Sequence, residues 1–486
     1  MVIVLLLTLL AAGAPAQDLA AKSEQAKQAM ARGDFTLAIS LYEELNRALP
    51  NNPGLVMNLS LAHFSVGNYA QAAGSFQRVI RLNPKILPAH LLLGMTYLKV
   101  GRTADAVAPL ETVLAAEPGN KKALLELADA CQILGRFGEA ARRFGELAEA
   151  DGGNSKAWYG LGLSREELAR ALSRKLEALA PESAHAAALA ASWRARDQQY
   201  ISAVRLYREA LSKMPGLRGA HAAIAEIYRA AGHEEWAATE EAREKQLSTP
   251  DCARAPLECG FASGRFEDVV LSVAETPEAL YWRARAQQEL SAAAFARLEE
   301  LPASVESYRL AAERYESRGR YPDAAQQWQA AFSLTPGEPA AQKGLARSLW
   351  LARDYQGALP ILQDLVSKEP ESAPLHYQLG DTLLELKGPV PALPYLEKAV
   401  MLAPQVVEAR ASLGKALLRD AKATAAIPHL EAALPADRDG STHYQLMRAY
   451  QSAGRPDDAR RTLARHEELK RQSAQDSSSG DLPPPD

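Results

Sequence analysis

The sequence is poor in cysteine and in aromatic residues. Three cysteines in 486 residues exclude a fold that depends on a disulfide framework. Aromatic residues make up only 6% of a chain that is 47% hydrophobic, so alanine and leucine supply much of the apolar content. Both residues enter helices at little cost. A formal net charge of −4 gives no overall attraction for nucleic acid. Composition therefore favours a helical protein that does not bind nucleic acid.

The sequence motifs of common catalytic and cofactor sites are also missing. There is no G-x-x-x-x-G-K-S/T phosphate loop and no G-x-S-x-G nucleophile elbow, and the nine histidines are scattered. His233 and Glu234 begin like a zinc-peptidase helix, but Ala237 stands where the second histidine is needed. We therefore expect no enzyme, no cofactor and no metal site. A site of unrecognised type within residues 247–301 is the alternative.

The first residues have the pattern of a signal peptide. Val2 to Leu10 form a short apolar run, and Ala14-Pro15-Ala16 offers small residues for cleavage before Gln17. The run is too short to span a membrane as a mature helix. We expect an exported protein, periplasmic or secreted, with no stable membrane span after cleavage. No lysine or arginine precedes the run, so an uncleaved membrane anchor is the alternative.

A period of 34 residues runs through much of the chain. Prolines mark the period, and each is preceded at fixed distances by a bulky residue, an alanine and, in many units, a glycine. The alanines are Ala38, Ala72, Ala106, Ala324, Ala358 and Ala392, and the glycines are Gly33, Gly67, Gly101 and Gly319. The glycine can end a first helix and the proline a second, so each period predicts a helical hairpin. One hairpin cannot bury its own apolar face, and the units must therefore stack.

This pattern resembles the tetratricopeptide-repeat family. The resemblance rests on the Leu-Gly pairs at 93–94, 379–380 and 413–414 and on the alanine, bulky residue and proline that follow them. It implies an all-α, right-handed α-solenoid of stacked helix-turn-helix hairpins. The expected units are 19–52, 53–86, 87–120, 121–154, 184–217, 218–249, 305–338, 339–372, 373–406, 407–439 and 440–471.

Two segments, 157–179 and 279–301, depart from the period in the same way. Tyr159 aligns with Tyr281, and the Glu-Leu and Leu-Glu pairs that follow also align, about 122 residues apart. We interpret the segments as copies of one duplicated unit, each a repeat that has lost the turn between its helices. Each should form a long or tightly hinged helix. Two unrelated helices rich in alanine and leucine are the alternative.

Five segments follow from these observations. They are a signal peptide at 1–16, an N-terminal repeat array at 17–154, an irregular region at 155–301 with regular repeats at 184–249, a C-terminal repeat array at 305–471, and a polar, proline-rich tail at 472–486 that we expect to be disordered.

The three cysteines fall into two groups. Cys252 and Cys259 lie in the least repeat-like stretch, and in an exported protein a disulfide between them would close a small loop. Two reduced, small hydrophobic side chains are the alternative. Cys131 stands at a core position of its repeat, equivalent to Tyr97, and should be a buried, unreactive thiol.

The resemblance also implies where partners bind, because the first helices of such repeats line a groove that contacts other proteins. Mapped onto this sequence, the N-terminal groove would present Met57, Leu61, Phe64, Leu91, Met95 and Leu98. The C-terminal groove would present Arg309, Glu313, Lys343, Arg347, Tyr377, Asp381, Lys415, Arg419, Tyr444 and Arg448. The apolar set suits a partner helix, and the mixed, net basic set suits an extended acidic peptide. Burial against neighbouring repeats and a solvated charged surface are the respective alternatives.

The sequence thus predicts a non-catalytic scaffold of the cell envelope that binds peptides or helices of other proteins. An adaptor for polysaccharide export or outer-membrane assembly is the alternative function. Partner identity, pathway and oligomeric state do not follow from the sequence.

Overall fold

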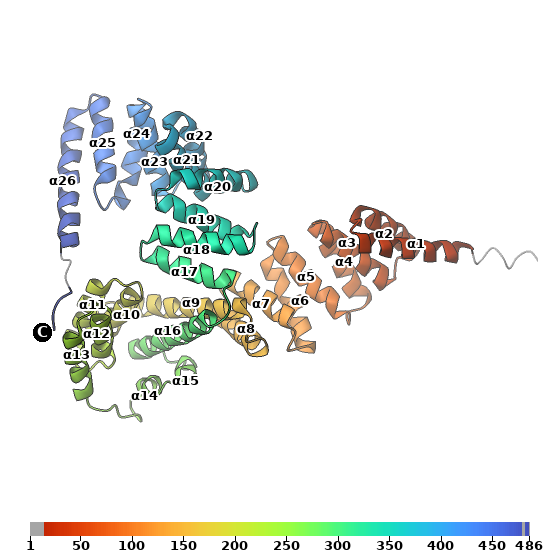
Figure 1. Ribbon diagram of the computed structural model, residues 1–486, viewed down its shortest axis with the longest axis horizontal. Helices are drawn as coiled ribbons and strands as arrows, with labels where there is room; N and C mark the ends of the chain where they lie inside the picture. Colours follow the sequence, from red (N-terminus) through yellow and green to blue (C-terminus); the bar gives the residue numbers. More distant parts are fainter. Residues whose placement is uncertain (1–13, 479–481, 486) are drawn as a thin grey trace, which may run out of the picture. The chain divides into compact units, whose positions relative to one another are not determined.

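The computed structural model describes residues 14–478 and 482–485, and all regular secondary structure in these residues is helical (Figure 1). The predicted all-α fold of repeated hairpins is confirmed. Most of the expected signal peptide, residues 1–13, lies outside the described residues, and the first helix, α1, begins at Ala14.

The chain divides into two compact units. Unit 1 comprises the described residues up to Arg174 together with Ala255–Ala274 and Trp282–Leu301. Unit 2 comprises Lys175–Arg254, Glu275–Tyr281 and the described residues from Pro302 onward.

Unit 1 begins with four helical hairpins. These are α1 (Ala14–Arg32) with α2 (Phe35–Ala48), α3 (Pro53–Ser65) with α4 (Tyr69–Leu82), α5 (Leu87–Lys99) with α6 (Thr103–Ala116), and α7 (Lys121–Ile133) with α8 (Phe137–Ala150). Each helix packs against its neighbours in the chain, as expected for stacked repeats.

The hairpin of α5 and α6 shows how the repeat residues act. Gly101 adopts a φ of 74°, a left-handed conformation that ends the first helix at low cost. An added Cβ on Gly94 would lie 2.6 Å from Leu110 Cγ, so only glycine permits this close approach of the two helices. Ala106 is fully buried in the same hairpin. The packing role assigned to these small residues is confirmed.

The buried side chains of α3 to α8 form one continuous core cluster that reaches Ala157. Cys131 belongs to this cluster, and burial raises the pKa of its thiol to about 11. The predicted burial of Cys131 is confirmed, and a thiol that stays protonated at neutral pH is a poor nucleophile.

The two irregular segments form long, uninterrupted helices. These helices are α9 (Ser155–Leu179), with 25 residues, and α16 (Pro277–Glu299), with 23. Within unit 1 they pack against each other. The Ser291 hydroxyl donates to the Gly162 carbonyl at 2.9 Å, and the rings of Tyr159 and Phe295 lie 6.3 Å apart. The contacts run in opposite directions along the two helices, so the pair is antiparallel.

The contact between Arg165 and Gln287 lies at the centre of this pair. The Arg165 guanidinium donates to Gln287 Oε1 at 3.2 Å across a sequence separation of 122 residues. That separation equals the offset between the two similar segments, so the two residues are equivalent copies. A duplicated helix that packs on its own copy brings equivalent residues together at a local two-fold axis. The geometry therefore supports the interpretation of an internal duplication.

The stretch that looks least like a repeat contains a miniature hairpin, α14 (Pro256–Ala262) and α15 (Phe266–Val270). An added Cβ on Gly260 would lie 2.9 Å from Val269 Cγ2, which is the close approach seen in the full repeats. The sequence signal was Gly264-Arg265-Phe266, which repeats Gly135-Arg136-Phe137. Cys252 and Cys259 are disulfide-bonded in this stretch.

Unit 2 contains the remaining hairpins. They are α10 (Ala184–Arg196) with α11 (Tyr200–Lys213), α12 (Ala220–Ala230) with α13 (Glu234–Gln246), α17 (Val305–Ser317) with α18 (Tyr321–Leu334), α19 (Pro339–Leu351) with α20 (Tyr355–Lys368), α21 (Ala373–Lys387) with α22 (Pro389–Leu402), α23 (Val407–Arg419) with α24 (Ala423–Ala433), and α25 (Ser441–Ser452) with α26 (Pro456–Ser478). A single 3-10 turn, η1 (Leu434–Ala436), follows α24.

The C-terminal tail differs from the expectation of disorder beyond residue 471. Helix α26 continues to Ser478, and residues 482–485 lie against α11 and α12 of the same unit. Within the described part of the chain, no helix has both the length and the apolar character that crossing a membrane requires.

Candidate binding faces

The six apolar residues predicted for the N-terminal groove lie on the first helices α3 and α5. We call this set the apolar face. All six side chains are half-buried. Five of them pack against the core cluster of unit 1, namely Met57, Leu61, Phe64, Leu91 and Leu98. These five side chains therefore support the core with one side and leave the other exposed, so burial against neighbouring repeats accounts for only part of each of them.

Helix α7 extends this face and adds a carboxylate that the sequence prediction missed. Asp129 follows Met95 by one 34-residue repeat and occupies the equivalent helix position. Burial raises the pKa of Asp129 to about 6, and Glu126 contributes in the same direction, while Lys156 and Lys122 oppose the shift. The repeat period was the signal that could have placed Asp129 on this face.

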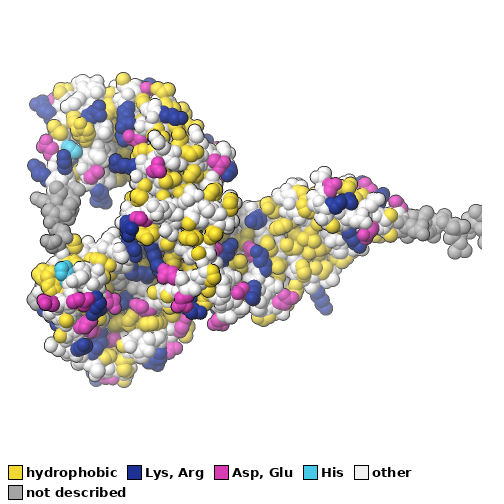
Figure 2. Space-filling model, in the orientation of Figure 1, with side chains coloured by type: hydrophobic (Ala, Val, Ile, Leu, Met, Phe, Trp, Pro, Cys, Tyr) yellow, Lys and Arg dark blue, Asp and Glu magenta, His cyan; other side chains and the backbone are white. Residues whose placement is uncertain are grey.

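The apolar face can bury hydrophobic side chains of a partner around one titratable carboxylate. Leucine and methionine adapt their rotamers to different apolar surfaces. In Figure 2, hydrophobic side chains gather over the N-terminal helices, whereas basic and acidic side chains are interspersed over the C-terminal helices.

The ten residues predicted for the C-terminal groove lie on α17, α19, α21, α23 and α25, and we call this set the charged face. These first helices contact one another in order, each with the first helix of the next repeat. At one helix position the charge alternates from repeat to repeat, in the order Glu313, Arg347, Asp381 and Lys415. Alternating charge favours attraction between neighbouring repeats over binding of a partner with one sign of charge.

Five of the six basic side chains of the charged face form ion pairs. The pairs are Arg309 with Glu313 (2.9 Å), Lys343 with Glu369 (2.7 Å), Arg347 with Glu316, Lys415 with Glu385 (2.7 Å) and Arg419 with Glu385 (3.5 Å). The net basic character expected for this face is therefore largely neutralised by carboxylates of the chain itself.

Glu316 joins three side chains of the neighbouring helices. Its carboxylate accepts hydrogen bonds from Trp328 Nε1 at 3.0 Å and from the Ser348 hydroxyl at 2.5 Å, and it pairs with Arg347. The Glu316 side chain is only 12% exposed. A carboxylate with this many partners stabilises the contact between repeats and is not available to a ligand.

Asp381 has a similar role two repeats later. Its carboxylate accepts from Trp350 Nε1 at 2.8 Å and from the Ser412 hydroxyl at 3.0 Å. The Tyr377 ring packs edge-on against Trp350 with centroids 5.3 Å apart. Burial, reinforced by Asp381, raises the pKa of the Tyr377 hydroxyl, which therefore stays protonated.

The end of the charged face remains accessible. Tyr444 is 42% exposed, and its ring lies 5.4 Å from that of His466. Arg448 is exposed and forms no hydrogen bond or ion pair with another described residue. An exposed tyrosine and a cation on one helix, α25, form the part of this face best suited to an external partner.

The described residues contain no group of three or more histidine, cysteine or acidic side chains that could hold a metal ion. His233, which begins the zinc-like segment, stacks on Trp236 with ring centroids 4.1 Å apart. Ala237 is fully buried. Both residues thus have packing roles.

Family models for the tetratricopeptide repeat match residues 23–85, 97–163 and 309–374. No curated protein matches the chain. A solved tetratricopeptide repeat protein from Parabacteroides merdae is 15% identical, with 68% of this chain and 99% of that chain covered and a TM-score of 0.33. YrrB is described as a tetratricopeptide-repeat protein with an unusual peptide-binding site. It is 23% identical, and the match covers 34% of this chain and 84% of YrrB with a TM-score of 0.29. A thermophilic tetratricopeptide-repeat protein from Thermus thermophilus is 21% identical, and the match covers 35% of this chain and 94% of that protein with a TM-score of 0.31.

The matched segment 97–163 contains Gly101, Ala106 and Leu110, whose conformation or packing is described above. Family models match regular hairpins in both units. Proteins built from this repeat act through protein–protein interaction. The chain therefore contains repeats of the tetratricopeptide-repeat family in both units.

Proposed function

We propose that this protein is a non-catalytic scaffold whose apolar face binds an amphipathic helix of a partner protein. The observation that carries the proposal is the column of half-buried leucine, methionine and phenylalanine side chains on successive first helices. A helix that binds in a groove inserts apolar residues at helical spacing, and this column offers the matching surface. The charged face is a weaker candidate for this binding site, because its charges are mostly paired within the chain.

Asp129 gives the proposed partner a further property. A lysine or arginine of the partner helix beside Asp129 would lower the pKa of this carboxyl from about 6. Binding would then release a proton at pH values below about 6, and affinity would fall as the pH drops through that value. We therefore propose a partner helix that carries one basic residue within its apolar stripe.

Site-specific photo-crosslinking in cells tests this proposal. A photoreactive phenylalanine analogue at Leu61 or at Met95 should yield the same crosslinked partner, which mass spectrometry identifies. The control position is Leu37, an apolar residue of α2 that is 41% exposed. A synthetic helix from the partner should then bind the purified protein, and Leu61→Glu should weaken binding at least tenfold. Equal crosslinking from Leu37, or a partner that binds Leu61→Glu unchanged, would contradict the proposal.

We further propose that the protein works outside the cytoplasm, in the periplasm or as a secreted protein. The apolar run followed by Ala14-Pro15-Ala16 supports this location, and so does the disulfide-bonded state of Cys252 and Cys259. Cell fractionation followed by N-terminal sequencing tests it. A mature chain that starts at Gln17 is expected, while an intact N-terminus in the membrane fraction would favour the uncleaved anchor. An adaptor role in polysaccharide export or outer-membrane assembly remains a prediction.

The interactions in the irregular region support a packing role for its side chains. Glu267 forms an ion pair at 3.0 Å with Arg165, which also contacts Gln287. The Phe261 and Trp282 rings lie 5.1 Å apart and join the miniature hairpin to α16. Glu267, Arg165 and Gln287 thus help to hold helices of unit 1 together.

A further inference from the structure

The proline-rich end of the chain occupies a defined surface of unit 2. Residues 482–485 read Leu-Pro-Pro-Pro. The Pro483 carbonyl accepts hydrogen bonds from the Tyr228 hydroxyl at 2.5 Å and from Arg208 Nη2 at 3.3 Å, and the Pro484 carbonyl also accepts from Arg208. Figure 1 shows the end of the chain beside α11 and α12.

The two donors are held in place by their own contacts. Arg208 Nη2 also donates to the Tyr228 hydroxyl at 3.2 Å, so the two side chains form one polar cluster. The Tyr228 ring packs edge-on against Trp236 with centroids 5.4 Å apart, and Trp236 in turn stacks on His233. Tyr228 is fully buried. A donor whose ring is fixed by packing loses little conformational freedom when it binds.

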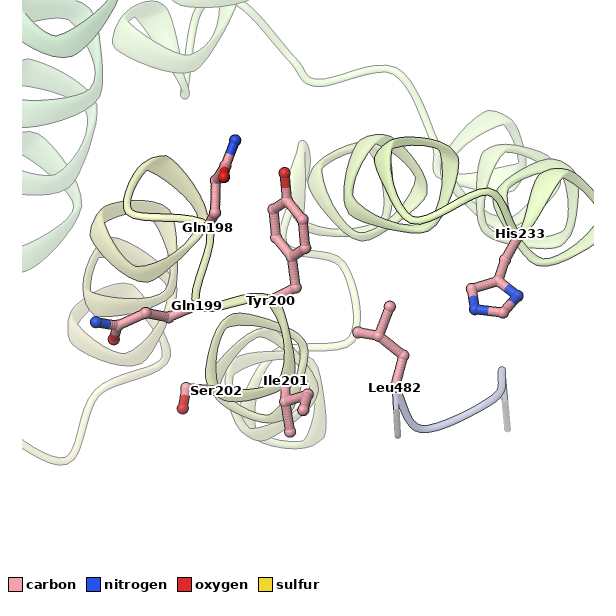
Figure 3. A pocket seen from close by; sticks show the side chains of 7 residues that line it. All are labelled: Gln198, Gln199, Tyr200, Ile201, Ser202, His233 and Leu482. Carbon is pink, nitrogen blue, oxygen red and sulfur yellow. The ribbon is translucent and has the colours of Figure 1, made fainter. Parts of the chain in front are cut away.

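Leu482 forms part of the wall of a neighbouring cavity. A cavity of about 470 Å³ is lined by residues 198–202 at the start of α11, by His233 and by Leu482. Figure 3 shows the Leu482 side chain between Ile201 and Tyr200 on one side and His233 on the other. The surface therefore places a cavity with a mixed polar and apolar lining beside the leucine, and hydrogen-bond donors at the carbonyls that follow.

This chemistry suits a proline-rich segment. Proline has no backbone N–H, so consecutive prolines present only carbonyl acceptors, and a guanidinium and a hydroxyl supply the matching donors. Proline-rich segments also favour the extended polyproline II conformation before binding, which lowers the entropy lost on docking. Aromatic side chains beside the donors are typical of surfaces that recognise such segments.

We propose that Arg208, Tyr228 and the adjacent pocket form a binding site for a Leu-Pro-Pro segment, and that residues 482–485 of the same chain occupy it. The tail is an intramolecular ligand that a proline-rich segment of the same type can replace. This site uses none of the residues of the apolar or charged face, so it does not depend on the function proposed above.

Spin labelling tests the docked tail in the full chain. Pro485→Cys provides a labelling site that retains the Pro483 and Pro484 carbonyls, while Cys131 is buried and the other two cysteines are disulfide-bonded. The nitroxide spectrum should show an immobilised label. Tyr228→Phe and Arg208→Ala should each convert most of it to a mobile label, because they remove donors to the tail. Arg205→Ala, which changes an exposed arginine of the same helix, should leave the spectrum unchanged.

A blocked Leu-Pro-Pro-Pro peptide tests binding from outside. A chain ended at Ser478 should bind a fluorescent form of the peptide at least tenfold more tightly than the full chain, because a tethered ligand competes at a millimolar effective concentration. A Leu-Ala-Ala-Ala peptide should bind at least tenfold more weakly. A mobile label in the unsubstituted background, equal effects of Arg208→Ala and Arg205→Ala, or no peptide binding to the shortened chain would each overturn the proposal.

Discussion

The first helices of the N-terminal repeats present leucine and methionine where those of the C-terminal repeats present arginine, lysine and glutamate. Leu61 and Met95 occupy the helix position that Arg347 and Lys415 occupy later in the chain. The apolar side chains remain half exposed, whereas the charged ones pair with carboxylates of neighbouring helices. The same type of hairpin therefore carries exposed apolar side chains in one unit. In the other unit it carries charged side chains that are neutralised by ion pairs within the chain.

The turns between helices differ along the chain as well. In the N-terminal repeats, Gly67 and Gly101 adopt φ values of 79° and 74°. In the C-terminal repeats, Arg353 and Ala421 adopt φ values of 60° and 58° at the equivalent position. A residue with a Cβ is strained in this region by roughly 1–2 kcal/mol. These two C-terminal repeats thus retain the turn geometry without its best residue, whereas Gly319 and Gly454 keep the glycine in two other turns of the same array.

The largest expected effect concerns the buried centre of the charged face. Glu316→Ala should destabilise the α17–α19 contact by about 2–4 kcal/mol, because it leaves Trp328, Ser348 and Arg347 without their shared acceptor. Hydrogen exchange of amides in α17 and α19 measures the loss. Glu313→Ala is the matched control on the same helix, and a similar loss there would show that Glu316 has no special role.

The apolar face is tested by the titration of Asp129. The folded-state pKa is about 6, above the usual 3.8, so ionisation costs stability as the pH rises from about 4 to about 6. Asp129→Asn should therefore match the natural chain near pH 4 and be about 1–2 kcal/mol more stable at pH 7.5. Denaturant unfolding at the two pH values checks this expectation. An equal difference in stability between the two proteins at both pH values would exclude ionisation of Asp129 as the cause.

The difference in turn residues can be tested by substituting glycine for alanine in one turn and alanine for glycine in another. Ala421→Gly should stabilise the α23–α24 hairpin by about 0.5–1 kcal/mol, because the relief of left-handed strain exceeds the entropy that glycine adds to the unfolded chain. Gly67→Ala should destabilise its hairpin by about 1 kcal/mol, since an added Cβ there meets no other atom within 4 Å and only the backbone is affected. Thermal unfolding of both variants measures the changes, and shifts of the same sign would contradict the explanation.

The smallest effect is expected at the exposed ion pairs. Lys343 and Glu369 lie 2.7 Å apart, but their side chains are 44% and 41% exposed. Lys343→Ala should change stability by less than about 0.5 kcal/mol. Raising the salt concentration should reduce even this difference. A loss of more than about 1 kcal/mol would mean that the charged face depends on its outer pairs as much as on Glu316.

Much of the fold could be predicted from the sequence, because the repeat residues act locally. Gly94 and Ala106 identified the close helix contact, and the aligned segments at 157–179 and 279–301 identified the two long helices. The miniature hairpin of α14 and α15 was missed because its helices have only 7 and 5 residues, too few for a helical pattern to emerge.

The candidate sites were less predictable. The repeat position placed Leu61 and Arg347 on the first helices, but it did not reveal that Glu316 pairs with Arg347. The contacts of the tail with α11 and α12 were also missed, because composition alone favours disorder in a proline-rich segment. Such contacts depend on residues in other helices, and a pattern along one helix does not contain them.

The sequence by itself determined the helical hairpin, its 34-residue period, the similarity of the two irregular segments and the location of the apolar and charged residues, because helix periodicity and turn preferences are local. Only the tertiary structure decided which charges are neutralised, which way α9 and α16 pack, and where the Leu-Pro-Pro-Pro segment lies. Burial, desolvation and hydrogen-bond pairing act between residues distant in the chain. Arg165 and Gln287, 122 residues apart, meet for that reason alone.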